Sequence, residues 1–228
     1  STLIKMICGI YKPDSGTISL DERKLALESY RDAINQRISM VSQEIQVVPE
    51  SSIGENIMLD KLDRFVKYGM INWKRLMEQS SEYLQMVGVN LPPTVSIGSL
   101  GSAHNQLIQI AKALAAEASV ILLDEPTSSL TKHEANNLFN IVHKLKEQGK
   151  ILIFVSHKLD EVYAICDRIS VLRDGKLIGT EAAAKLSQEQ LIRMMIGRET
   201  NEKFFGLLKV DRHQQALRVK DIGQSGTF

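Results

Sequence analysis

Two adjacent carboxylates follow a short apolar stretch near the middle of the chain. Asp124 and Glu125 come directly after Val120–Leu123 and before Pro126. Such a stretch predicts a strand buried on both faces of a parallel sheet, so the two acids would lie at its carboxyl edge, where open α/β sheets bind ligands. There the first acid could hold Mg²⁺, and the second could activate a water for attack on a phosphate. The alternative is a pair of surface acids that begins a loop.

Two further polar side chains follow apolar stretches. His157 comes after the predicted strand Ile151–Val155, and Gln43 comes after the predicted strand Ile38–Ser42. Parallel strands end at the same edge, so we expect the imidazole near the acidic pair, where it could hydrogen-bond a terminal phosphate. A histidine at a strand end is otherwise most often structural or solvated. Gln43 could contribute an amide oxygen to the same edge.

The first residues of the chain also have a possible role. Ser1 and Thr2 begin an amphipathic stretch, Thr2–Cys8, that predicts a helix ending at Gly9. The free N–H groups and the dipole at a helix start attract phosphate. By themselves, a serine and a threonine at a terminus carry no such meaning.

The elements around the acidic pair are well marked. Thr131 and Glu134 form a predicted capping box, and the apolar positions that follow, spaced as one helical face, are Leu138, Ile141, Val142 and Leu145. Strand, capped helix and strand together predict a βαβ unit with a parallel sheet. Arg168–Arg173 and Lys176–Thr180 predict a β-hairpin on an Asp-Gly turn.

Other segments give weaker patterns. A short strand is expected at Thr17–Leu20, a helix-prone stretch from about Asp60 to Gly88, and a second helix from Asn105 to Ala116. Within the helix-prone stretch, Trp73 is expected to be a packing residue. The two cysteines, Cys8 and Cys166, lie among apolar residues and are expected to be buried thiols.

Composition excludes several classes of protein. The 228 residues are 43% hydrophobic and 24% charged, the balance of a soluble globular protein. The longest apolar runs are four or five residues, whereas a membrane-spanning helix needs roughly 20. The formal net charge of +1 gives no overall field that favours nucleic acid or an anionic membrane. Two widely separated cysteines indicate a reducing compartment rather than a disulfide scaffold.

Taken together, the acidic pair, His157 and Gln43 resemble the ATP-binding subunits of ABC transporters. The resemblance covers about residues 1–198 and implies an α/β P-loop NTPase fold, with a parallel sheet flanked by helices, a helical subdomain and small antiparallel β elements. It implies ATP and Mg²⁺ as cofactors, with Glu125 as general base and His157 as the switch histidine. The nucleotide would be bound by Ser1, Thr2, Gln43 and Asp124, of which Ser1, Gln43 and Asp124 would hold Mg²⁺. The loop that contacts the opposing half would be Ser128, Ser129, Leu130 and Thr131.

A narrower resemblance is to the tandem ATPases that import simple sugars such as ribose, galactose, xylose or autoinducer-2. It depends on residues 9–16, 110–114 and 194–199. It implies the N-terminal half of a longer protein: a nucleotide-binding domain at 1–198 without its N-terminal strands and P-loop glycines and lysine, with a helical subdomain at about 60–115. A linker at 199–215 and the start of a second nucleotide-binding domain at 216–228 would follow.

The same resemblance implies partners and a location. The partners would be membrane permease subunits, the second nucleotide-binding half in the same chain and, indirectly, a periplasmic or extracellular sugar-binding protein, with no nucleic acid. The protein would attach peripherally to the cytoplasmic face of the membrane. One alternative is a soluble ABC ATPase of DNA repair or translation, which would predict a long coiled-coil insertion or a basic surface. The other alternative is a non-catalytic piece that binds ATP poorly.

One motif departs from the family pattern. The family signature is Leu-Ser-Gly-Gly-Gln, which presents a serine hydroxyl and backbone N–H groups to the γ-phosphate on the opposing half. Here the corresponding residues are Leu100, Gly101, Ser102, Ala103 and His104. The serine is lost at position 101. We therefore expect the site closed by this segment to be impaired, while the site built on Asp124, Glu125 and His157 remains active.

Overall fold

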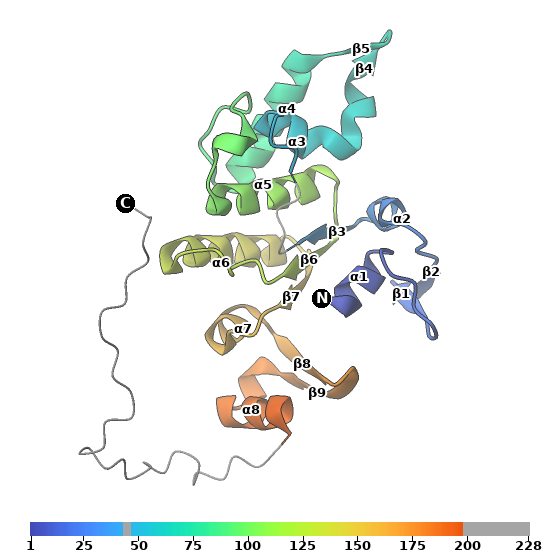
Figure 1. Cartoon of the computed structure of the whole chain (residues 1–228), viewed down its shortest axis with the longest axis vertical. Helices are drawn as coiled ribbons and strands as arrows, with labels where there is room; N and C mark the ends of the chain where they lie inside the picture. Colours follow the sequence, from blue (N-terminus) through green and yellow to red (C-terminus); the bar gives the residue numbers. More distant parts are fainter. Residues whose placement is uncertain (43–46, 198–228) are drawn as a thin grey trace, which may run out of the picture. The chain divides into compact units, whose positions relative to one another are not determined.

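A three-stranded parallel sheet lies at the centre of the computed structural model, which describes residues 1–42 and 47–197. Its order is β3 (Ile38–Val41), β6 (Val120–Asp124) and β7 (Ile151–Val155), as Figure 1 shows. Every residue of β6 is buried, which confirms the prediction of a strand covered on both faces. Strand β7 is bonded to β6 on one side, and its first residue, Ile151, is exposed.

The predicted βαβ unit is confirmed. Helix α6 (Lys132–Glu147) connects β6 to β7, and its capping box at Thr131 and Glu134 is present. The four apolar positions of its predicted face, Leu138, Ile141, Val142 and Leu145, are all buried. The capping box and the apolar face, both visible in the sequence, therefore predicted this helix correctly.

The two faces of β6 belong to different apolar clusters because side chains alternate along a strand. Ile121 and Leu123 pack with residues of α5 (Ser102–Ala115) and α6. Val120 and Leu122 pack with residues of α1 (Thr2–Ile7) and α2 (Tyr30–Asn35). Helix α1 ends with Cys8 as its C-cap, and the Cys8 side chain is fully buried, as expected. Strands β1 (Ile18–Leu20) and β2 (Arg23–Leu25) form an antiparallel pair beside these helices.

The segment between β3 and β6 is mostly helical. It contains α3 (Ile53–Met58), η1 (Leu59–Phe65), α4 (Trp73–Met86), η2 (Ile97–Ser99) and α5. The expected helix-prone stretch from Asp60 to Gly88 is interrupted by a hairpin, β4 (Val66–Lys67) and β5 (Met70–Ile71). The turn residues Tyr68 and Gly69 have φ of +54° and +78°, a left-handed conformation that a helix cannot contain. Helix α5 begins three residues before the expected Asn105, because Gly101 is its extended N-cap.

The described residues divide into two compact units, of which the first ends at Ile169 and the second begins at Ser170. The first contains the parallel sheet, α7 (Leu159–Ile165) and the described site residues. The second contains most of β8 (Arg168–Arg173), all of β9 (Lys176–Ala182), η3 (Ala183–Lys185) and α8 (Gln188–Ile196). Strands β8 and β9 pair through a turn at Asp174 and Gly175, both with positive φ, which confirms the predicted hairpin.

The described residues leave some predictions outside their range. Gln43, the predicted linker at 199–215 and the predicted second domain from 216 lie outside residues 1–42 and 47–197. Within those two ranges, none of the helices has the length and hydropathy needed to cross a lipid bilayer.

Candidate functional site

Asp124 ends the central strand at the carboxyl edge of the sheet. It is paired in register with Val155 and is only 5% exposed. Its Oδ1 atom is buried and has no hydrogen-bond partner. A buried carboxylate oxygen without a partner is costly, and it is the kind of ligand that Mg²⁺ prefers. This oxygen is therefore suited to be one ligand of a divalent cation.

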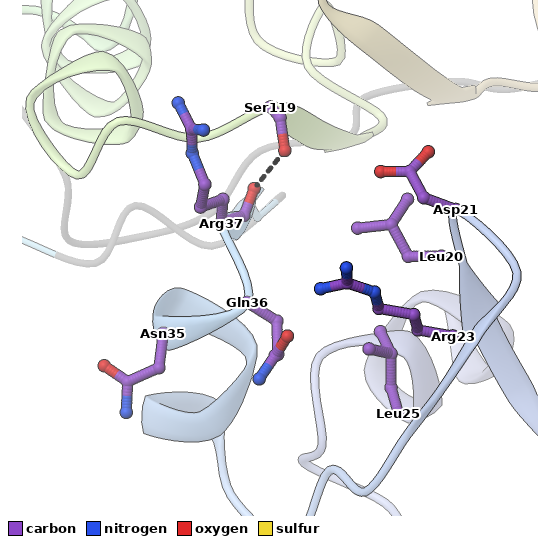
Figure 2. Close-up of a pocket in the computed structure, with 8 residues that line it drawn as sticks. All are labelled: Leu20, Asp21, Arg23, Leu25, Asn35, Gln36, Arg37 and Ser119. Carbon is purple, nitrogen blue, oxygen red and sulfur yellow. Dashed lines mark hydrogen bonds between the residues drawn. The ribbon is translucent and has the colours of Figure 1, made fainter.

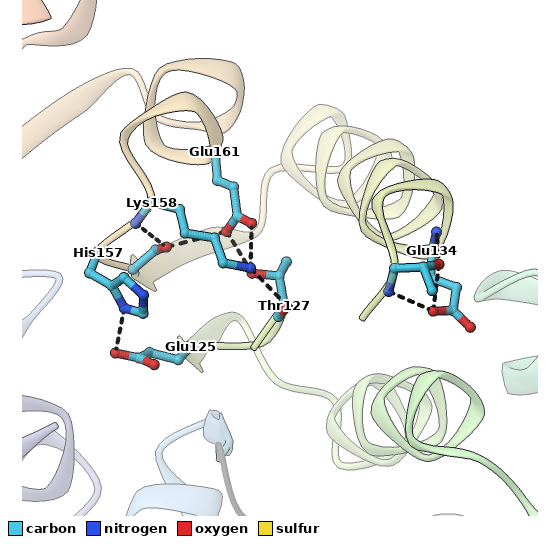
Figure 3. A network of polar contacts seen from close by, with 8 residues as sticks. Glu125, Thr127, Glu134, His157, Lys158 and Glu161 are labelled. Carbon is cyan, nitrogen blue, oxygen red and sulfur yellow. Dashed lines mark hydrogen bonds and ion pairs between the residues drawn. The ribbon is translucent and has the colours of Figure 1, made fainter. Parts of the chain in front are cut away.

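Glu125 turns the backbone away from the strand. Its N–H donates to the Val155 carbonyl at 2.9 Å, and its φ is +47°. This conformation is unfavourable for a side chain with a Cβ, at a cost of about 1–2 kcal/mol, and it persists where the surroundings determine it. It places the Glu125 carboxylate next to His157: the Nδ1 atom of the ring lies 3.2 Å from Oε1 (Figure 3). The expected proximity of these two residues is confirmed.

A third acid, which the sequence reasoning missed, joins the two loops that carry this pair. The largely buried Glu161 accepts hydrogen bonds at Oε2 from Thr127 Oγ1 at 2.6 Å and from Ser156 Oγ at 3.2 Å (Figure 3). Thr127 lies two residues after Glu125, and Ser156 lies just before His157. Lys158 completes the network, with Nζ 3.2 Å from Glu161 Oε1 and donating to the Thr127 carbonyl at 3.1 Å.

The Glu161 network fixes backbone positions on both sides of the candidate site. The His157 side chain is 68% exposed, so few contacts of its own restrain it. Its placement therefore depends on the loop from which it projects. The available signal in the sequence was an acid in the first turn of the helix that follows His157.

The loop after β6 also contacts the start of α5. The expected dimer-contact loop, Ser128 to Thr131, ends in the cap of α6, and the Ser129 carbonyl accepts a hydrogen bond from Ser102 Oγ at 3.2 Å. Gly101, the N-cap of α5, is exposed and makes no side-chain cap. Of the five residues at the expected signature position, Ser102 is thus the one with a hydroxyl, and that hydroxyl is engaged within the chain.

The remaining predicted residues occupy helix starts. Ser1 is the N-cap of α1 without a side-chain cap, and Thr2 is the first helical residue. His104 lies in the first turn of α5 and is exposed. Hydrogen bonds from Thr131 hold the pKa of the nearby Glu134 carboxyl below its usual value, and the His104 and His133 side chains lower it slightly further.

A separate hollow lies at the opposite edge of the sheet. About 450 Å³ in volume, it is lined by Leu20, Asp21, Arg23, Leu25, Asn35, Gln36, Arg37 and Ser119 (Figure 2). Arg37 and Ser119 directly precede β3 and β6, so the hollow is at the amino ends of the strands. Their hydrogen bond, from Ser119 Oγ to the Arg37 carbonyl at 3.3 Å, ties these ends together. Asp124, Glu125 and His157 are at the other end of the strands.

Comparison with known proteins gives consistent matches. The pattern of the family described as ABC transporter matches residues 1–128. A ribose import ATP-binding protein, RbsA, of Corynebacterium glutamicum is 40% identical over the whole chain, which covers 43% of that relative. The RbsA of Geobacillus kaustophilus is 36% identical over the whole chain, which covers 46% of it. The chain thus spans less than half the length of these relatives.

Solved structures show the same fold. A nucleotide-free ATP-binding cassette from an ABC transporter superposes with a TM-score of 0.72 at 20% identity, covering 90% of this chain and 83% of the other. The ADP conformation of another such cassette gives a TM-score of 0.71 at 21% identity, covering 90% and 82%. Both support an α/β ATP-binding cassette architecture.

Proposed function

The chain belongs to the ABC transporter family, and from this premise we propose that it is the ATP-binding and ATP-hydrolysing part of a protein that powers import of a simple sugar such as ribose. The observation that carries the proposal is the arrangement at the carboxyl edge of the sheet. A buried carboxylate with an unpartnered oxygen, Asp124, lies beside a glutamate–histidine pair at 3.2 Å. This arrangement suits hydrolysis of a terminal phosphate better than binding alone.

The mechanism assigns a different role to each side chain. Asp124, with Ser1 and Gln43, would hold Mg²⁺, which when bound neutralises charge on the phosphates. Glu125 accepts a proton from a water molecule, whose oxygen then attacks the γ-phosphorus as ADP leaves. His157 donates a hydrogen bond to a γ-phosphate oxygen. The short distance between Glu125 and His157 lets one imidazole contact both the base and the phosphate.

The proposal extends to the rest of the protein. Residues 1–198 belong to one nucleotide-binding domain, of which they are a part, with a helical subdomain at about 60–115. Residues 199–215 are a linker, and residues 216–228 are the start of a second domain. The length of the RbsA relatives supports this division, since each is more than twice as long as the chain. The partners are permease subunits and, indirectly, a sugar-binding protein, and the protein lies at the cytoplasmic face of the membrane.

The test is the substitution Glu125→Gln in the longer protein assembled with its permease. Loss of a general base lowers turnover by about 10²–10⁴-fold, and we expect a fall of this size in ATP hydrolysis with the affinity for ATP unchanged. Glu147→Gln, at the exposed end of α6, is the matched control and should leave turnover unchanged. Substantial residual hydrolysis in the Glu125 variant would refute the proposed role of this carboxylate.

A further inference from the structure

The β4–β5 hairpin presents apolar side chains to solvent. Tyr68 is 89% exposed, Met70 72% and Val66 48%. The base of the hairpin is well anchored, because Phe65 is buried and its carbonyl accepts a hydrogen bond from the Asn72 N–H at 2.8 Å. Figure 1 shows the hairpin beyond the ends of α3 and α4. A firmly held turn that exposes three apolar side chains indicates a surface that binds something.

Trp73 extends this surface onto the start of α4. It is 47% exposed, so the expectation of a packing residue is met only in part. Trp73 is the first residue of α4 and lies on the same helical face as Leu76, Ser80 and Leu84. It is at the end of the helix, where much of its side chain stays open to solvent. It is also the single tryptophan of the chain.

The charge of this segment differs from that of the whole chain. Between Asp63 and Glu78 there is no acidic residue, whereas the segment contains Arg64, Lys67, Lys74 and Arg75. Arg64 is paired with Glu117 at 2.7 Å, and the other three side chains are exposed. The Lys67 ammonium lies 5.4 Å from the centre of the Tyr68 ring. The overall charge of +1 therefore conceals a local patch that is cationic and apolar.

The lysines of this surface favour a lipid surface over a protein surface. Tyrosine, tryptophan, methionine and arginine are common at protein–protein interfaces, but lysine is depleted there. At the level of lipid headgroups, in contrast, tyrosine and tryptophan are enriched and lysine and arginine bind anionic lipids. A projecting turn can also enter the headgroup layer, whereas protein partners usually bind through matched, close-packed surfaces.

We propose that the hairpin surface, formed by Val66, Lys67, Tyr68, Met70, Trp73, Lys74 and Arg75, binds the anionic surface of a membrane. The cations contact lipid phosphates, and the Tyr68 and Met70 side chains lie among the headgroups. This contact requires neither ATP nor the carboxyl edge of the sheet. It therefore goes beyond the proposed function and is tested separately from it.

The test uses the 228-residue chain and vesicles of phosphatidylcholine, alone or mixed with anionic phosphatidylglycerol. Trp73 is the only tryptophan, so its emission reports directly on the hairpin surface. We expect a shift of the emission to shorter wavelength, and sedimentation with the vesicles, in the presence of phosphatidylglycerol only. Added salt should weaken binding, since it screens exposed charges. A sample without vesicles controls for self-association.

Variants separate the hairpin surface from other exposed residues. Each cation near an anionic membrane strengthens binding by about fivefold, so Lys67→Glu together with Lys74→Glu should weaken it by at least about tenfold. Tyr68→Ser with Met70→Ser should abolish the wavelength shift. Leu172→Ser with Leu177→Ser, which changes exposed leucines on the β8–β9 hairpin, should leave binding unchanged. Circular dichroism checks that each variant is folded. If a double variant does not fold, the single substitution Lys67→Gln is used in its place.

Three outcomes of the vesicle experiments would overturn the proposal. They are no binding of the wild-type chain to anionic vesicles, equal loss of binding in the β8–β9 control, and unchanged binding in the folded hairpin variants. Binding of the hairpin to permease subunits in detergent, without binding to vesicles, would also overturn it and would identify a protein partner instead.

Discussion

At the scale of single residues, Gly101 is the position at which we expect the family signature to have lost its serine. A Cβ built at Gly101 meets no heavy atom within 4 Å, so a serine fits without rearrangement. The nearby Ser102 hydroxyl does not replace it, because it donates to the Ser129 carbonyl. The loss at this position is therefore chemical rather than steric.

We predict that Gly101→Ser increases ATP turnover of the longer protein. Loss of one hydrogen-bond donor to a developing charge costs about 10²–10³-fold at the affected site, so restoring a silent site beside an active one should raise total turnover by about twofold. Steady-state hydrolysis measures the change, and Ser102→Ala, which removes the hydroxyl engaged with Ser129, is the comparison. Unchanged turnover in a folded Gly101→Ser protein would show that the missing hydroxyl does not limit activity.

At the scale of elements, Glu161 connects the loop after β6, the loop after β7 and the start of α7. We predict that Glu161→Ala lowers kcat by about 10–100-fold, which is the size of effect that displacement of catalytic groups produces. The KM for ATP should stay within about twofold of its wild-type value, because no atom of Glu161 contacts the nucleotide in the proposed mechanism. Glu161→Gln should retain most activity, since one amide oxygen can accept both hydroxyl donors.

Asp160 provides the matched control for this prediction. It is the neighbouring acid in the first turn of α7 and is exposed, so Asp160→Ala should leave kcat unchanged. Equal effects of the Asp160 and Glu161 substitutions would mean that the charge at the start of α7, rather than the hydrogen bonds to Thr127 and Ser156, is what matters.

The elements that the sequence predicted best are those with complete local signals. Helix α6 has its capping box and its apolar face, and the apolar runs of β6 and β7 lie on either side of it. The β4–β5 hairpin was missed because its turn begins with Tyr68, a residue that seldom adopts positive φ. The Glu161 network was missed because Thr127 is 34 residues from Glu161 in the sequence, and the register of β6 and β7 is what brings the two together.

At the scale of the whole molecule, the two faces of the sheet have separate cores, and Cys8 reports on one of them. It is fully buried against the face formed by Val120 and Leu122, and burial raises its pKa to about 12. Because of this raised pKa, the reactive thiolate of Cys8 is almost absent from the folded chain at pH 8. In the unfolded chain a free cysteine has a pKa of about 8.5, so the thiolate becomes much more abundant.

We therefore predict that iodoacetamide modifies Cys8 at pH 8 only as the chain unfolds. Mass spectrometry along a urea titration should show labelling that follows the loss of circular dichroism. Cys166, which is partly exposed, should be modified earlier and provides the internal comparison. Rapid labelling of Cys8 in the absence of urea would indicate that the core beside α1 opens without global unfolding.

The position of β7 in the sheet has a practical consequence. Among the described residues its backbone pairs with β6 alone, and its sequence, Ile-Leu-Ile-Phe-Val, is wholly apolar, with Ile151 exposed. A strand with one free edge and apolar side chains is a template for another strand. We therefore expect the purified chain to associate through this strand as its concentration is raised, which size-exclusion chromatography at several concentrations would detect.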